Sequence, residues 1–329
     1  MLIGDRVKRG FLLLVAALNL AATDTAWAQQ TDRIPVVGVL SAATATSNPV
    51  LAGLRESLRE LGYVEGRNIK LEVRAAEGRM DRLPRLAQEL GQLNVDVIVA
   101  FNTPAARAAL EATTAPVVFQ VGDPVGSQLA ESLVQPGGSG TGISMVSVEL
   151  TSKQLEFLHL MAPRARRIAC LSNSANPVGA RVFEEAAKAA RTLNIQMVKL
   201  DARNTGELDA ILHALPRSGV DGILVAGDPF LFANRAKLAQ AVREARLPAI
   251  FTYREFHDHG VLMSYGASLK DAARKLGVYV DKILKGAKAG DLPIEQISNY
   301  PLVIDLHVAH ELRLKAPPEL LQRADEVIQ

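Results

Sequence analysis

The sequence has almost none of the residues that could cross-link it. Its 329 residues include a single cysteine, Cys170, and a single tryptophan, Trp27, and aromatic residues make up only 5%. One cysteine excludes an intramolecular disulfide. Because Cys170 lies in the apolar run of residues 168–171, we expect a buried structural thiol. Trp27 lies in a segment that we expect to be removed, so aromatic ligand contacts would come from Phe and Tyr.

Long apolar runs are also missing after the N-terminal segment. No later segment approaches the ~20 consecutive apolar residues of a membrane-spanning helix. The N-terminal segment itself has Lys8 and Arg9, then an apolar run over residues 11–22 and a cleavage site with small residues at Ala26 and Ala28. This pattern predicts a secretory signal peptide over residues 1–28, cleaved after Ala28. Since no cysteine stands at the cleavage site to take a lipid, we expect a freely diffusing periplasmic protein.

A large net charge is absent as well. The chain has 37 basic and 35 acidic residues, a net charge of +2. Without a basic patch we expect no nucleic-acid partner. The chain after residue 28 is long enough for two lobes, because single hydrophobic cores stop growing at about 250 to 300 residues.

Short apolar strands alternate with amphipathic helices along the chain. This alternation predicts parallel sheets built from βαβ units. Strands are expected at residues 36–40, 69–73, 95–101, 116–121, 142–148, 168–172, 196–200, 222–226, 249–252, 261–265 and 297–304. The clearest helices are expected at residues 49–61, 83–90, 177–193, 208–215, 232–245 and 269–284.

The alternation restarts after a segment rich in Gly and Pro at residues 135–142, which indicates a second lobe. We predict an α/β fold of two Rossmann-like lobes, whose parallel sheets are joined by crossover strands around a ligand cleft. The strand at residues 261–265 is expected to return to the first lobe. The expected boundaries are residues 29–142 with about 258–290 for lobe 1, and residues 143–257 with about 291–329 for lobe 2.

Polar loops follow the strands, and ligands of open α/β sheets bind at the carboxyl ends of strands. Arg254 is a candidate for a bidentate bond to a ligand carboxylate, with an ion pair to Glu255 or Asp258 as the alternative. Asp123 and Asp228 each lie in a Gly-Asp-Pro tripeptide. Either carboxylate is a candidate acceptor for a ligand ammonium or hydroxyl, with helix or turn capping as the alternative.

Aromatic and small polar side chains complete the predicted site. Phe230, Tyr253 and Tyr265 are candidates to enclose an aromatic or aliphatic part of the ligand, with core packing as the alternative. The predicted polar shell, for which turn capping is the alternative, consists of Ser41, Asn102, Thr103, Ser144 and Asn173. Such a lining suits a small polar or zwitterionic solute.

Motifs of enzymes are missing. His257 with His259, and His307 with His310, are the closest approach to a metal site, but no further His or Cys stands at ligand spacing. We therefore interpret these histidines as solvated surface residues. The glycine-rich segment lacks the ending of a phosphate loop, and no Gly-x-Ser-x-Gly elbow occurs. We expect no metal, no cofactor and no enzymatic activity, and a secreted hydrolase is the weaker alternative.

Several short motifs occur together over nearly the whole chain after residue 28. They include Gly62-Tyr-Val-Glu-Gly-Arg-Asn68, Gly122-Asp-Pro124, Gln135-Pro-Gly-Gly138, Gly227-Asp-Pro-Phe230 and Leu262-Met-Ser-Tyr-Gly266. In these motifs the chain resembles the ABC-transporter substrate-binding proteins of the tryptophan/tyrosine-binding type, which have the type I periplasmic-binding-protein fold.

The resemblance implies a monomeric receptor that captures a small solute between its lobes. It would deliver an amino acid, an aromatic acid or an organic acid to an inner-membrane ABC permease driven by a cytoplasmic ATPase. A ligand-sensing protein that serves a receptor is an alternative. The effector domain of a repressor shares the fold, but the predicted signal peptide stands where DNA-binding helices would be needed.

Overall fold

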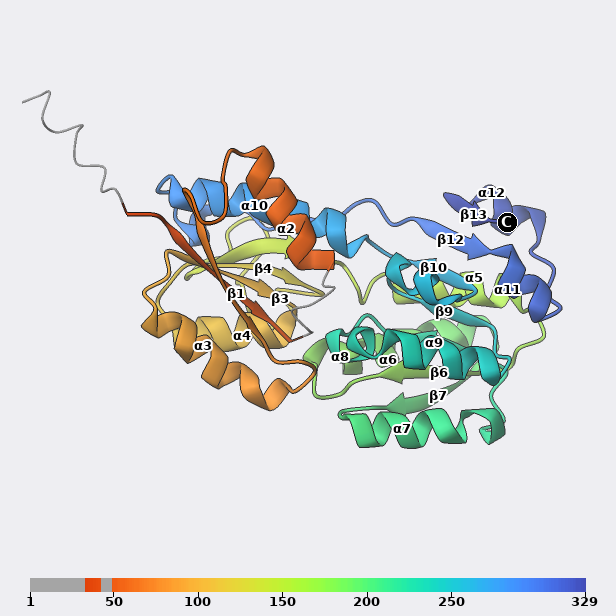
Figure 1. Cartoon of the computed structure of the whole chain (residues 1–329). Coiled ribbons are helices and arrows are strands. Elements are labelled where there is room, and N and C mark those ends of the chain that lie inside the picture. The colour runs from red at the N-terminus through yellow and green to blue at the C-terminus, as the bar shows by residue number, and fades with distance from the viewer. Residues whose placement is uncertain (1–32, 43–48) are drawn as a thin grey trace, which may run out of the picture. The chain divides into compact units, whose positions relative to one another are not determined.

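Two β-sheets, each covered by its own helices, make up the part of the chain that the structure describes (Figure 1). The structure is a computed structural model that describes residues 33–42 and 49–329. The predicted signal peptide over residues 1–28 therefore lies outside the described residues. Within the described residues, no helix is long and apolar enough to cross a membrane. The two sheets lie in one unit, Pro35–Gln329, and we call each sheet with its helices a lobe.

Lobe 1 has a six-stranded parallel sheet in the order β11-β5-β4-β3-β1-β2. Strands β3 and β4 are buried along their whole length because helices cover both faces of the sheet. Its elements are β1 (Val36–Ser41), α2 (Pro49–Glu60), β2 (Lys70–Ala75), η1 (Met80–Arg82), α3 (Leu83–Gln92), β3 (Val97–Phe101), α4 (Thr103–Ala112), β4 (Val117–Val121), β5 (Gly140–Ser144), α10 (Leu269–Leu284), η4 (Ala289–Asp291) and β11 (Glu295–Gln296).

Lobe 2 has a seven-stranded sheet in the order β13-β12-β10-β9-β8-β6-β7, in which only the β10–β12 pair is antiparallel. Its elements are α5 (Thr151–Met161), β6 (Arg167–Ser172), α6 (Pro177–Thr192), β7 (Gln196–Asp201), α7 (Thr205–Ala214), η2 (Leu215–Arg217), β8 (Gly222–Val225), α8 (Pro229–Ala233), α9 (Arg235–Glu244), β9 (Ala249–Phe251), η3 (Arg254–His259), β10 (Met263–Tyr265), β12 (Leu302–Asp305), α11 (Leu306–Glu311), α12 (Pro318–Gln322) and β13 (Glu326–Ile328).

Three crossover segments join the lobes, at residues 145–150, 266–268 and 297–301. The first contains Val146 with φ 51°. A β-branched residue strongly disfavours this left-handed conformation, so the backbone is strained where the chain first leaves lobe 1. Strain of this kind persists only where the surrounding structure holds it in place.

The structure corrects the predicted lobe boundaries in three places. Strand β10 pairs with β9 and antiparallel with β12, so it belongs to lobe 2 and not to lobe 1 as predicted. Strands β5 and β11 both belong to the sheet of lobe 1, although the last two residues of β5 and the whole of β11 were assigned to lobe 2. The helix predicted at residues 232–245 is two helices, α8 and α9, that meet at Asn234. Helix α5 was not predicted.

The predicted buried thiol is confirmed. Cys170 is fully buried in β6, between β8 and β7 of the lobe 2 sheet. Burial raises the pKa of its thiol to about 12, because the thiolate would have no water around it. The thiol is therefore unreactive in the folded protein.

Candidate ligand-binding site

A cavity lies between the lobes, at the carboxyl ends of β1, β3, β4 and β8. It leaves about 60 Å³ for the centres of water-sized molecules, within about 610 Å³ of empty space that includes its opening to solvent. Lobe 1 contributes Ser41, Phe101 and Gln120, and lobe 2 contributes Phe232 and Tyr253. A cavity walled by two lobes is the usual place for a small ligand in such a fold.

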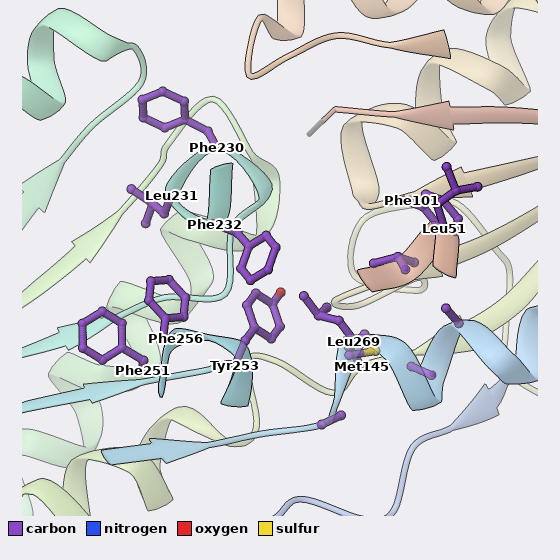
Figure 2. Packing of buried hydrophobic residues seen from close by; sticks show 14 of the residues in the cluster. Leu51, Phe101, Met145, Phe230, Leu231, Phe232, Phe251, Tyr253, Phe256 and Leu269 are labelled. Carbon is purple, nitrogen blue, oxygen red and sulfur yellow. The ribbon is translucent and has the colours of Figure 1, made fainter. Parts of the chain in front are cut away.

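The apolar wall of the cavity comes from both lobes (Figure 2). Phe232 and Tyr253 of lobe 2 pack edge to face, with ring centroids 5.7 Å apart and an angle of 88°. They face Leu269 and Phe101 of lobe 1 and Met145 of the first crossover segment, and all five belong to one buried cluster. A wall of this kind can bury an aromatic or aliphatic group of a ligand.

The polar wall of lobe 1 follows β3 and β4. Asn102 caps α4, since its Oδ1 accepts a hydrogen bond of 3.1 Å from the backbone N–H of Ala105. Its φ of 83° is unusual for a residue other than glycine and brings Thr103 to the wall as the first residue of α4. On β4, Gln120 is 5% exposed, and its Oε1 has no hydrogen-bond partner within the described chain. A buried amide oxygen without a partner is costly in the absence of a ligand.

The polar wall of lobe 2 depends on a buried carboxylate behind it. Asp228 accepts hydrogen bonds from the backbone N–H groups of Phe230 (2.8 Å) and Leu231 (3.1 Å), and thereby caps α8. It also accepts one from Nδ2 of Asn176 (2.9 Å) and a longer one from Asn173 (3.3 Å). Burial raises the pKa of Asp228, although these donors act in the opposite direction. Asp228 thus fixes Asn176, which lines the cavity.

Comparison with known proteins identifies the family. The family model described as ABC transporter substrate binding protein matches residues 34–328. The chain belongs to this family. The tyrosine-binding protein of Clostridioides difficile (strain R20291) is 25% identical over 256 residues, which cover 77% of this chain and 73% of that protein.

Solved structures agree with this assignment. The structure of an ABC domain in complex with L-Trp from Streptococcus pneumonia matches with a TM-score of 0.82 and 25% identity, and covers 90% of this chain and 100% of that one. A conserved domain protein from Vibrio cholerae matches with the same score, identity and coverage. The two-lobed α/β fold of this substrate-binding protein is therefore the type I periplasmic-binding-protein fold, as the sequence predicted.

Four of the predicted ligand residues lie in the wall of this cavity: Ser41, Asn102, Thr103 and Tyr253. The other predicted ligand residues are not among the residues that line this cavity. Arg254, with 43% of its side chain exposed, forms an ion pair of 2.6 Å with Glu326 and not with Glu255 or Asp258.

Two further predicted residues of lobe 2 are aromatic. Tyr265 packs edge to face on Phe157, with ring centroids 5.0 Å apart, and also lies against Tyr300. Phe230 is 2% exposed and points away from Tyr253 (Figure 2).

The remaining predicted residues have structural partners. Asp123 accepts a hydrogen bond from the backbone N–H of Gly126 and forms an ion pair with Arg181 on α6, so it links a loop of lobe 1 to a helix of lobe 2. Ser144 ends β5 and is buried in the sheet. Asn173 and Asp228 form the cluster behind the wall. For all of these residues, contact with a ligand stays a prediction.

Several wall residues of this substrate-binding protein were missed by the sequence analysis. Phe101 and Gln120 lie at or near the ends of β3 and β4, so strand position alone could have suggested them. Met145 follows directly after β5, and Asn176 caps α6. Phe232 was taken for the start of a helix, and no sequence signal distinguishes it from Phe230.

The histidines differ from the interpretation as surface residues in one respect. His307 and His310 are exposed, but His257 and His259 are half-buried, and Nε2 of His257 lies 3.0 Å from Oγ of Ser264. Within the chain described, no group of three or more His, Cys, Asp or Glu side chains could hold a metal ion. Burial lowers the pKa of His257 from its ordinary value of 6.5 to about 4, although Asp305 nearby acts in the opposite direction.

The lowered pKa of His257 predicts an acid-sensitive fold. Between pH 6.5 and pH 4 the unfolded chain binds a proton at His257 that the folded protein does not bind, so stability falls as the pH falls. Acidification from pH 7.5 to pH 4.5 should lower the free energy of unfolding by about 2 to 3 kcal/mol through this residue. Urea unfolding at both pH values should show a smaller loss for His257→Gln than for the wild type. His310→Gln is the exposed control, and an equal loss in all three proteins would contradict this assignment.

Proposed function

We propose that this protein is the periplasmic solute-binding component of an ABC importer. It captures a small solute, an amino acid, an aromatic acid or an organic acid, between its lobes and delivers it to an inner-membrane permease with a cytoplasmic ATPase. The observation that carries the proposal is a cavity with an apolar wall from both lobes and a buried amide oxygen that has no hydrogen-bond partner among the described residues, in a chain of this family. The predicted signal peptide supports export.

Contacts from both lobes give the proposed function its mechanism. A ligand that touches Thr103 and Phe101 on one side and Phe232 and Tyr253 on the other binds the closed arrangement more tightly than an open one. The crossover segments would absorb the motion as hinges, since they alone join the sheets along the chain. The closed, ligand-loaded form is the one that the permease would recognise.

A thermal-shift screen tests the proposal. The purified protein is heated with amino acids, aromatic acids, organic acids, sugars and divalent metals. A ligand that binds only the folded state raises the melting temperature. At a concentration of 100 times its Kd, it adds about 2.7 kcal/mol to the free energy of unfolding. We expect a rise with a compound that combines a carboxylate with an apolar group. No rise with any compound, after copurified ligand has been removed by refolding, would contradict the proposal.

A substitution in the cavity wall tests whether the compound found in the screen binds in this cavity. Phe232→Ala should weaken binding of the compound found in the screen at least tenfold, because it removes a ring from the wall. Arg254→Ala is the control outside the wall and should leave the affinity within about threefold. Isothermal titration measures both. Loss of binding in Arg254→Ala, with Phe232→Ala unaffected, would move the site away from the cavity described above.

A further inference from the structure

One ion pair joins the two lobes directly. Asp123, in the loop that follows β4 of lobe 1, pairs with Arg181 on α6 of lobe 2. Among the residues that the structure describes, every other ion pair lies within one lobe, as that of Arg254 with Glu326 does in lobe 2. The charges of Asp123 and Arg181 therefore attract one lobe to the other.

This pair lies at the rim of the cavity. Gly122, one residue before Asp123, and Val178, three residues before Arg181, both line the cavity. A Cβ added to Gly122 would lie only 3.1 Å from Cγ1 of Val178, so the loop and α6 are in close contact there. Because the loop belongs to lobe 1 and α6 to lobe 2, opening of the cavity between them separates the two charges.

The surroundings of the pair strengthen its attraction. The side chain of Asp123 is 12% exposed and that of Arg181 is 39% exposed, so water and salt screen the pair less than they screen a surface pair. Arg181 still keeps part of its hydration, which limits the desolvation cost that a fully buried pair would have. The carboxylate is also held in place, since Oδ1 of Asp123 accepts a hydrogen bond of 2.8 Å from the backbone N–H of Gly126.

The first crossover segment is fixed to the same loop. The backbone N–H of Met145 donates to the carbonyl oxygen of Val121 (2.8 Å), and that of Ser147 donates to the carbonyl oxygen of Gly122 (3.2 Å). Between them lies Val146, with its strained φ of 51°. These bonds keep the loop with lobe 1. When lobe 2 moves about this segment, α6 therefore moves relative to Asp123 and does not carry the loop with it.

We infer that Asp123 and Arg181 are positioning residues that favour the closed arrangement of the lobes and thereby raise the affinity for the ligand. Neither residue is among those that line the cavity, so neither acts by touching the ligand. The pair forms when the lobes are closed and is lost when they open, which lowers the free energy of the closed state relative to the open one. The effect on affinity rests on the proposed function, whereas the effect on the lobes does not.

Single-molecule FRET on the ligand-free protein tests the effect on the lobes. Dyes are attached to cysteines introduced by Glu111→Cys and Arg191→Cys, at exposed positions near the ends of α4 and α6, while the buried Cys170 stays unlabelled. Arg181→Gln should raise the ratio of open to closed molecules at least fivefold. Asp123→Asn keeps an acceptor oxygen for the loop and should raise the ratio by a similar factor. An unchanged ratio in both variants would overturn the inference.

Three further variants distinguish loss of this pair from general damage. Asp123→Asn combined with Arg181→Gln should open the lobes no further than either single change, because each removes the same attraction. Arg181→Lys keeps the charge and should restore most of the closed population. Arg254→Gln breaks an ion pair of comparable exposure within lobe 2 and should leave the ratio unchanged. Additive effects in the double variant, or an equal shift in Arg254→Gln, would overturn the inference.

Binding of two probes tests the effect on affinity. L-tyrosine and L-tryptophan are used, because one relative is named for tyrosine and another was solved with L-Trp. For a probe that binds the wild type, the Kd of Arg181→Gln should rise by the factor by which the closed fraction falls in FRET. An unchanged Kd at a halved closed fraction would overturn the link between the pair and affinity. If neither probe binds, the FRET result alone decides the inference, and the thermal-shift screen decides the proposed function.

Discussion

Gly142→Ala should lower the free energy of unfolding by about 3 to 5 kcal/mol, through overpacking and backbone strain together. Gly142 lies in β5 with φ 143° and pairs with Phe119 of β4. A Cβ added there would lie 2.0 Å from the carbonyl oxygen of Phe119 and 2.6 Å from its nitrogen. Both atoms are backbone of a central strand, so relief would require β5 to move away from β4.

A second glycine, in the turn before β5, allows the cost of backbone strain to be measured apart from the cost of steric overlap. Gly138 has φ 58°, but an added Cβ would meet no atom within 4 Å. Gly138→Ala should therefore cost only the ~1 to 2 kcal/mol of a left-handed alanine. Urea unfolding of both variants measures the difference. A Gly142→Ala protein as stable as Gly138→Ala would mean that β5 shifts freely, and that the start of the first crossover is less constrained than the structure indicates.

Asp228→Ala should also lower the free energy of unfolding by about 3 to 5 kcal/mol, because it leaves several buried donors without an acceptor. The orphaned groups are the backbone N–H groups at the start of α8 and the side-chain amides of Asn173 and Asn176. Ligand affinity should fall as well, since Asn176 lines the cavity and loses its anchor.

Two further variants distinguish the carboxylate's capping role from its charge. Asp228→Asn keeps one acceptor oxygen and should cost only about 1 to 2 kcal/mol. Asp258→Ala removes an exposed carboxylate from the same lobe and should be near neutral. Chemical denaturation gives the stabilities, and titration with the identified solute gives the affinities. Full stability in Asp228→Ala would show that the cluster behind the wall does not support α8.

Local signals predicted much of the fold. The predicted helix at residues 269–284 coincides with α10, whose start is fixed by Ser268 as the cap of Asp271 N–H and whose end is followed by Gly286 in a left-handed conformation. Both signals lie within a few residues of the helix ends. The alternation of strands and helices in each lobe could also be predicted from local signals, because the elements of each βαβ unit follow one another in the sequence.

Partners far apart in the sequence account for the errors. Nothing near residues 261–265 indicates that β10 pairs with β12, about forty residues later. Helix α5 begins without a side-chain cap, and its buried face includes the polar residues Thr151 and Gln154, so it has a weak local signature. Helix α8 is followed by Asn234, whose Nδ2 donates a hydrogen bond to the carbonyl oxygen of Phe230. The continuous helical pattern of the sequence does not reveal this bond.

The same limit applies to the candidate site. Its location at the strand ends could be predicted, because it follows from topology. Charged residues were favoured as ligand contacts, but the partner of Arg254 is Glu326, which lies 72 residues away. The donors that surround Asp228 include Asn173, 55 residues away. Among the described residues, a side-chain atom such as Oε1 of Gln120 is left without a hydrogen-bond partner only after the whole chain has folded, so the sequence does not reveal it.

The buried thiol of Cys170 allows the rate at which lobe 2 unfolds to be measured by chemical labelling. It is the chain's single cysteine, and it lies fully buried on β6 of the lobe 2 sheet. A thiol reagent such as DTNB can therefore label only molecules whose lobe 2 sheet has opened. The labelling rate in native buffer reports how often that happens, and its slowing with a bound solute would measure ligand stabilisation without heat or denaturant.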